Sequence, residues 1–538
     1  MPHARFVTSI WRQIVAREWR FILFFWLSLT LFYVAFSPSA GTDYVKRNLT
    51  ATEQVTNNLI RLANREAPLE VNWTQHGCTE VLLKTPFFLV SRLFFGGSRA
   101  WNWRVMLLQT ILSTSLLCAL LLYWARKLTG SWIWAYGLAL STGVATMLWP
   151  YAYIGLETTQ SLFLLVAGYL ALEREPRRSG GELLLFAVAC AIAVSAKQNG
   201  IFLFPAVFFL IWMYCRDKER SGWAGLARRW KEAATVTVAI LGAVALNRYT
   251  RETFWGQGGE EKYIATLFID SPLTYLFNLI GYFGSPNKSL FIYAPLTLLC
   301  VWALRRTRAL RPDVVNWTLL TLGGLACGFA LSVVWTEENW GPRYLHSAIA
   351  PLVVCLAVTL RGQKFQWRRQ KLLLAAVFLG TACSFLGVCF HYGVLYLSAI
   401  RSSQSTLEAF QGDSRLNHVS FNWRLLRVWG SERLGLASQP EKWPPEPFWW
   451  FERPADAPQL KQVDLRELAL PAPVLFRGWN AGSSASPTGY RSLRALCAAC
   501  LLLGVAGLCW TWRKATKLEE NEALMSHIQE ERSRRKTE

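Results

Sequence analysis

Long hydrophobic stretches recur along most of this chain and are separated by short polar connections. A helix needs about 20 apolar residues to cross a hydrocarbon core about 30 Å thick. Applied to this pattern, that length predicts about twelve membrane-spanning helices. The predicted spans are 19–36, 105–123, 132–149, 159–172, 183–196, 201–215, 233–247, 288–304, 314–335, 345–360, 372–396 and 493–512. The fold class predicted is therefore an all-α membrane protein.

Two further apolar stretches, 81–95 and 273–283, are too short or too interrupted to cross a membrane. Lys84, Pro86 and Arg92 break up the first of them. A short amphipathic helix of this kind is typical of a segment that lies along the membrane surface. We expect two surface helices here, in addition to the spanning ones.

Composition supports the prediction of a membrane protein, and the distribution of charge predicts its orientation in the membrane. The chain is 52% hydrophobic, and only 17% of its residues are charged, with a net charge of +22. The positive charges gather in alternate connections, and basic connections face the cytoplasm. The basic segments are the N-terminal leader, 173–181, 216–232, 305–311 and 361–371, whereas 150–158, 197–200 and 336–344 carry few Lys or Arg. We therefore expect an inner-membrane protein with both termini in the cytoplasm, whose charge contacts anionic lipid and not nucleic acid.

Two connections on the outer side are long enough to have structure of their own. Residues 37–104 follow the first span and show helical spacing, with a cap expected at Thr50 or Thr52. Residues 397–492 are rich in Pro and Trp and predict a small irregular lobe. The predicted organisation is a membrane domain over 1–396 that includes 37–104, the lobe 397–492, a final span 493–512 and a cytoplasmic tail 513–538.

Ionisable residues are nearly absent from the middles of the spans and gather at their outer ends. They include Asp43, Glu53, Glu157, Lys197 and Lys288, together with Arg343, which precedes Tyr344 at the start of a span. If the outer connections fold together, carboxylates and cations share one cavity. A carboxylate can act as a general base on an acceptor hydroxyl, and Lys or Arg can neutralise a phosphate. Taken singly, each of these residues is better explained as a solvated loop charge. Anchoring to lipid headgroups explains Lys288 and Arg343 as well as a substrate phosphate does.

Three strings carry a resemblance to a known group of proteins. These are TMLWPYAYIGLETTQSLFLLVAGYLAL (146–172), GSPNKSLFIYAPLTLL (284–299) and ENWGPRYLHSAIAPLVV (338–354). They resemble segments of bacterial membrane proteins in the GT-C glycosyltransferase superfamily, relatives of protein O-mannosyltransferases and of enzymes that use polyprenyl-phosphate sugars. The resemblance covers roughly residues 19–400. It implies GT-C-like architecture with an active site at the extracytoplasmic face.

The resemblance also implies roles for particular residues. An acidic residue of the first outer connection serves as base in that superfamily, which by position is Asp43, with Glu53 as the competing candidate. Tyr44 follows Asp43 where the common pattern has a second acidic residue. Glu157 matches an acidic position that organises the donor or a divalent metal in some relatives. By the same reasoning, Lys288 and Arg343 lie near the lipid phosphate. Lys197 and Tyr344 are assigned to binding of the donor or its phosphate as well.

The function expected is transfer of a sugar from a polyprenyl-phosphate donor to a glycan, lipid or protein acceptor. No cofactor is required by the sequence, and a divalent metal is left open. Two other functions stay open as well: a lipid-linked sugar transporter or flippase, and a non-catalytic membrane scaffold that uses the 397–492 lobe. The lack of charged relays in mid-membrane disfavours an ion-coupled transporter.

Overall fold

A computed structural model of the chain describes most of the predicted membrane domain. It covers residues 2–38, 43–74, 77–96, 99–153, 156–173, 180–216, 229–256, 271–285, 288–331, 342–363, 370–390, 419–420, 422–423, 425–427, 473 and 487–537. Within these ranges the secondary structure is helical apart from one isolated bridge between Pro38 and Pro473. The predicted all-α class is therefore confirmed. Most of the 397–492 lobe lies outside the described residues, and its structure stays a prediction.

The helices follow one another with short connections, and η1 and η3 are 3-10 helices. In chain order they are α1 (Pro2–Ala35), α2 (Asp43–Ala63), α3 (Cys78–Phe95), α4 (Arg99–Thr129), α5 (Trp132–Val144), α6 (Leu148–Tyr151), α7 (Leu156–Leu172), α8 (Gly180–Ser195), η1 (Gln198–Leu203), α9 (Phe204–Cys215), α11 (Trp230–Trp255), α13 (Pro272–Gly284), α14 (Leu290–Tyr293), α15 (Leu296–Leu310), α16 (Pro312–Ala330), η3 (Arg343–Ala348), α17 (Ile349–Thr359), α18 (Lys371–Cys389) and α23 (Pro487–Thr537).

Each of the twelve predicted spans overlaps a helix, but the helices differ in length. Six stretches in the described part are long and apolar enough to cross a membrane: Glu18–Ala35, Arg104–Thr129, Trp230–Phe254, Pro312–Ala330, Lys371–Cys389 and Arg491–Met525. Shorter apolar helices cover Gly180–Ser195, Gly200–Cys215 and Arg343–Thr359. The chain is thus a multi-span membrane protein, and the count of about twelve crossings stays a prediction.

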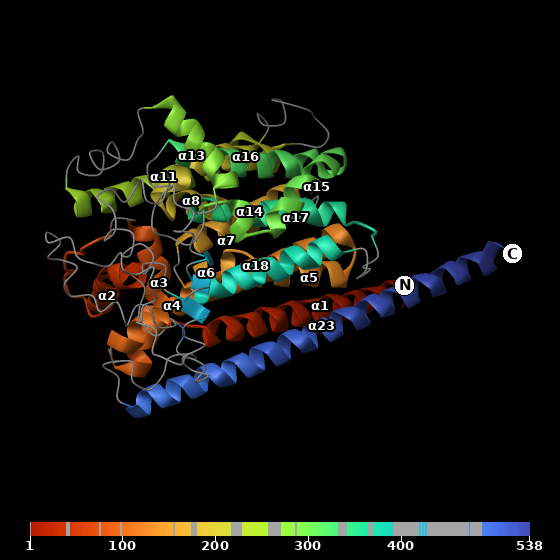
Figure 1. Cartoon of the computed structure of the whole chain (residues 1–538), viewed down its shortest axis with the longest axis horizontal. Helices are drawn as coiled ribbons and strands as arrows, with labels where there is room; N and C mark the ends of the chain where they lie inside the picture. The colour runs from red at the N-terminus through yellow and green to blue at the C-terminus, as the bar shows by residue number, and fades with distance from the viewer. Residues whose placement is uncertain are drawn as a thin grey trace.

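The outer connection after α1 forms two helices that pack together. α2 begins at Asp43, so the cap predicted at Thr50 or Thr52 is wrong; Thr52 is buried inside the helix. α3 covers the stretch 81–95, and Val81 packs against Val55 of α2. Figure 1 shows α2 and α3 near one end of the long helices, away from the two chain termini. The second expected surface helix, 273–283, is α13.

The first and last long helices run side by side along the molecule (Figure 1). Glycines of α23 make this close approach possible. A Cβ added at Gly504 would lie 2.7 Å from the main-chain nitrogen of Phe32 in α1. The Tyr136 hydroxyl donates a 2.6 Å hydrogen bond to the Leu508 carbonyl and fixes α5 to the same helix. Small residues at such a contact let two membrane helices pack backbone to backbone. α23 is also helical through the tail 513–537.

We expect Gly504→Ala to destabilise the protein by about 1–3 kcal/mol, because the added methyl group forces α23 away from α1. Gly242→Ala is the matched control, since a Cβ at Gly242 of α11 meets nothing within 4 Å. Thermal unfolding of both variants in detergent measures the difference. Equal unfolding midpoints would contradict the close packing of α1 and α23.

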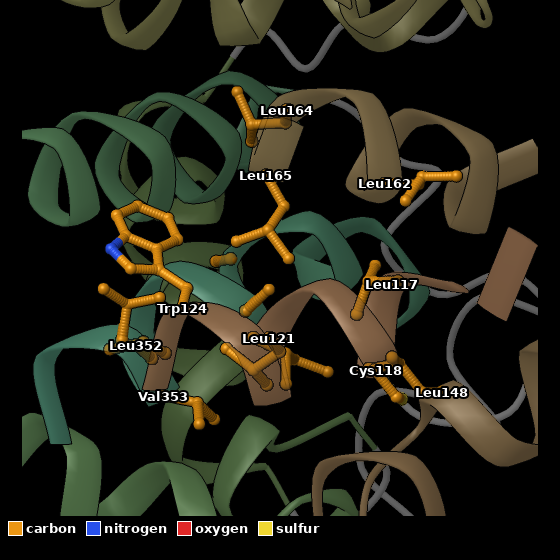
Figure 2. Packing of buried hydrophobic residues seen from close by; sticks show 14 of the residues in the cluster. Leu117, Cys118, Leu121, Trp124, Leu148, Leu162, Leu164, Leu165, Leu352 and Val353 are labelled. Atoms are coloured by element: carbon orange, nitrogen blue, oxygen red, sulfur yellow. The ribbon is translucent and has the colours of Figure 1, made fainter. Parts of the chain in front are cut away.

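The buried core is centred on α4, a helix that is apolar around most of its circumference. Figure 2 shows Leu121 and Trp124 of α4 among residues of α7 and α17, including Leu165 and Leu352. A helix without a polar face packs on several sides at once. α4 therefore packs against several neighbouring helices and fixes the positions of the outer connections at their ends.

The end of α7 that faces the predicted cytoplasmic side is fixed by polar contacts. Arg311 donates to the Glu173 carboxylate at 3.0 Å and to the Leu172 carbonyl at 3.1 Å. The Trp124 indole also donates to Glu173 at 3.0 Å. A basic side chain that satisfies the last carbonyls of a helix stabilises its C-terminus. This contact holds α7 in place, and its opposite end carries the site described next.

Candidate functional site

Three outer connections that are far apart in the sequence bring their charged side chains together. Glu157 is in the first turn of α7, Lys197 lies between α8 and η1, and Arg343 begins η3. One oxygen of Glu157, Oε1, accepts from Lys197 Nζ and, at 2.5 Å, from Arg343 Nε. The three residues are only 2%, 6% and 4% exposed. The structure thus joins three of the predicted site residues in one buried cluster.

The aromatic ring of Tyr344 lies against both cations of this cluster. Lys197 Nζ lies 4.9 Å from the centre of its ring, and Arg343 Cζ lies 5.3 Å from it. The ring stacks on Phe329 of α16 at 4.0 Å between centroids. Cations over an aromatic face are stabilised by the ring quadrupole. Tyr344 therefore contacts the buried cations, besides its expected place as an interfacial residue.

Two cations of the cluster share one carboxylate oxygen in a buried place. The other carboxylate oxygen, Glu157 Oε2, has no hydrogen-bond partner among the described residues. A buried cation attracts an anion more strongly than an exposed one does. The arrangement is suited to hold a phosphate together with a neighbouring hydroxyl group.

A second set of hydrogen bonds joins α7 and η3 beside the ion pairs. Ser161 donates to the Glu157 carbonyl at 2.6 Å, and its oxygen lies 2.8 Å from His346 Nδ1 and 3.0 Å from the Ser347 hydroxyl. Ser161 is four residues after Glu157, and His346 is three after Arg343, so each pair lies on one helix face. Sequence reasoning missed His346 and Ser161. Their spacing from the charged residues was the available signal.

Local backbone geometry places Lys197 and Arg343. A Cβ at Gly200 would run into the main chain of Val194, so the tight turn that carries Lys197 requires glycine there. Pro342 directly precedes η3, which begins at Arg343, and its ring restricts the backbone there. Both cations are therefore held by rigid connections between helices.

The other predicted site residues are placed differently. Lys288 is buried, 3% exposed, in the connection between α13 and α14. Glu53 is exposed on α2. Asp43 is the first residue of α2, and its side chain lies outside the described part of the structure. The base candidates are thus not shown in contact with the cluster.

A second buried ion pair was missed by sequence reasoning. Glu80 and Lys84 on α3 form a salt bridge with 0% and 2% exposed side chains. Glu80 Oε1 has no hydrogen-bond partner among the described residues. The spacing of four residues on a helix is the usual signal for such a pair. The pair was missed because we interpreted Lys84 only as a residue that interrupts the apolar stretch 81–95.

Metal ligands do not gather in the described ranges. No group of three or more His, Cys, Asp and Glu side chains is found there. One oxygen of Glu157, the residue for which a metal was left open, is bound by two cations. The described residues therefore assign no ligand to a metal.

The structure is similar to the crystal structure of ArnT from Cupriavidus metallidurans bound to undecaprenyl phosphate, with a TM-score of 0.45 and 15% sequence identity. The similarity covers 78% of this chain and 81% of that one. No protein-family model matches the sequence. No curated protein matches it either.

Proposed function

We propose that this protein is a membrane glycosyltransferase that moves a sugar from a polyprenyl-phosphate donor to an acceptor at the outer face of a bacterial inner membrane. The observation that carries the proposal is the buried cluster of Glu157, Lys197 and Arg343. Its two buried cations lie where helices that pass through the apolar core meet the outer connections. A lipid phosphate has both the charge and the location that this cluster suits.

The proposed reaction is a direct displacement at the anomeric carbon. A base takes the proton of an acceptor hydroxyl, whose oxygen forms a bond to the anomeric carbon. The bond between this carbon and the phosphate oxygen breaks, and polyprenyl phosphate leaves with the electron pair. Lys197 and Arg343 stabilise the negative charge that develops on the leaving phosphate. A single displacement inverts the configuration at the anomeric carbon.

Glu157 has a supporting part in this proposal. Its Oε1 holds both cations in place, so that they do not turn toward lipid headgroups outside the bundle. Preorganised charges contribute more to catalysis than mobile ones, because no reorganisation accompanies the reaction. The Glu157 Oε2 atom, which no described residue binds, is assigned to accept from a donor sugar hydroxyl. Glu157 thus orients the cations and meets the sugar.

We expect Arg343→Gln to lower the rate of transfer by about 10²–10³-fold, because an electrostatic stabiliser of the transition state is lost. The assay follows labelled polyprenyl phosphate released by purified protein in lipid nanodiscs. Arg248→Gln is the matched control: Arg248 also pairs with a glutamate, Glu252, but this pair is exposed on α11. Equal losses in both variants would contradict a specific role for Arg343.

The same assay separates the other functions. A transporter or flippase moves the labelled lipid across the membrane without releasing polyprenyl phosphate. A scaffold neither moves nor cleaves it, and variants of the cluster then leave the cell's surface glycans unchanged. Transport without cleavage by the wild-type protein would replace the glycosyltransferase proposal.

A further inference from the structure

We propose that Asn247 is a positioning residue for the proposed transfer: its side chain holds the start of α3 and the turn that carries Lys197 in one fixed arrangement. This inference rests on the proposed function, because Lys197 is assigned there to the donor phosphate. Asn247 lies on α11 and is only 1% exposed.

Asn247 satisfies main-chain groups at the ends of two other helices. Its amide nitrogen donates to the carbonyl of Ser195, the last residue of α8. Its amide oxygen accepts from the main-chain nitrogen of Thr79 at 3.1 Å, in the first turn of α3. The first N–H groups and last carbonyls of helices lack partners within their own helix. One side chain therefore caps α8 and α3 together.

Direct contacts between the two helix ends make the junction tight. The Thr79 and Ser195 hydroxyls lie 3.2 Å apart. Gly77 has a φ of 80°, a conformation that favours glycine, and a Cβ there would also collide with Asn247. Both features exclude a side chain at this position. The Cys78 thiol donates to the Asn247 oxygen at 3.4 Å, and burial raises the pKa of Cys78, which keeps it protonated. A movement of one of these groups therefore disturbs its hydrogen bonds to the others.

The junction lies between the two buried charge clusters. Lys197 comes two residues after Ser195, and Glu80 directly follows Thr79. The salt bridge of Glu80 with Lys84 is thus one helical turn from the same junction. A shift of α3 against α8 changes the position of Lys197 relative to the Glu80–Lys84 salt bridge. Asn247 holds α3 and α8 in a fixed arrangement. It is uncharged, and among the described residues its hydrogen bonds go to Cys78, Thr79 and Ser195 and not to the charged side chains of either cluster.

A double-mutant cycle tests whether Asn247 acts through Lys197. We measure binding of labelled polyprenyl phosphate to the full chain in nanodiscs. We expect Asn247→Ala to weaken binding about tenfold in the wild-type background and by less than twofold in a Lys197→Met background, because residues acting as one unit are not additive. Asn58→Ala is the control, since Asn58 on α2 is a buried asparagine that bonds the Leu69 main chain instead.

Two further measurements keep the inference falsifiable. Asn247→Asp keeps the acceptor for Thr79 but loses the donor to Ser195, and we expect it to weaken binding as the alanine variant does. Labelling of Cys78 by a maleimide should become faster in Asn247→Ala, with Cys78→Ser as the blank. Equal effects of Asn247→Ala in both backgrounds, or unchanged binding and labelling, would overturn the positioning role. If Lys197→Met alone leaves binding unchanged, the proposed phosphate site fails instead, whatever Cys78 labelling shows.

Discussion

Asp43→Asn is expected to lower the rate of sugar transfer by about 10²–10⁴-fold, the contribution of a general base. The amide cannot take the proton of the acceptor hydroxyl, but it nearly preserves the shape of the side chain. Binding of the lipid donor should stay within twofold of wild type, because the cations assigned to the phosphate are unchanged. Single-turnover assays with labelled donor, together with donor binding to the same preparation, measure the two quantities separately.

Glu53→Gln is the control for this prediction. Glu53 is the competing base candidate, and its side chain is exposed on α2. Asp43 is the first residue of the same helix. We expect Glu53→Gln to retain transfer within about twofold of wild type, since an exposed carboxylate contributes little beyond solvation. If Glu53→Gln loses transfer and Asp43→Asn keeps full activity, Glu53 and not Asp43 is the general base.

The helices of this fold follow from the sequence because hydrophobic length is a strong local signal. Every predicted span overlaps a helix, and both short apolar stretches formed separate helices, α3 and α13. Boundaries were less predictable. α2 begins at Asp43, earlier than its expected cap, and Leu49, which precedes that cap, is buried in the main hydrophobic core and stabilises the longer helix. Such tertiary contacts cannot be read from one segment.

The charged cluster was predictable in part. Glu157, Lys197, Arg343 and Tyr344 stand out because ionisable and interfacial residues at the ends of spans are informative. That Glu157 pairs with both cations is not encoded locally, since the three residues come from separate connections. Asn247 was missed for a different reason. A lone asparagine in an apolar helix has no sequence pattern, and its role appears only when two other helix ends meet it.

Glu157→Gln is expected to destabilise the protein by on the order of 3–5 kcal/mol, because it removes the carboxylate that two buried cations share. Lys197 and Arg343 both bond the same oxygen of Glu157, so their nitrogens are close together. Two like charges about 4 Å apart repel by about 4 kcal/mol at an effective dielectric constant near 20. The neutral amide does not offset this repulsion. Thermal unfolding in detergent measures the loss, and Glu252→Gln, in the exposed pair on α11, should change stability by less than about 1 kcal/mol.

Two additions distinguish charge repulsion from simple misfolding of the Glu157→Gln variant. Replacing Lys197 by Met in the same chain removes one cation, and this double variant should recover most of the lost stability while staying inactive. Added polyprenyl phosphate should raise the unfolding midpoint of Glu157→Gln more than that of the wild type, because an anion bound between Lys197 and Arg343 replaces the missing carboxylate. An unfolding midpoint for Glu157→Gln equal to that of the wild type would show that the three side chains do not form the buried cluster on which the phosphate site depends.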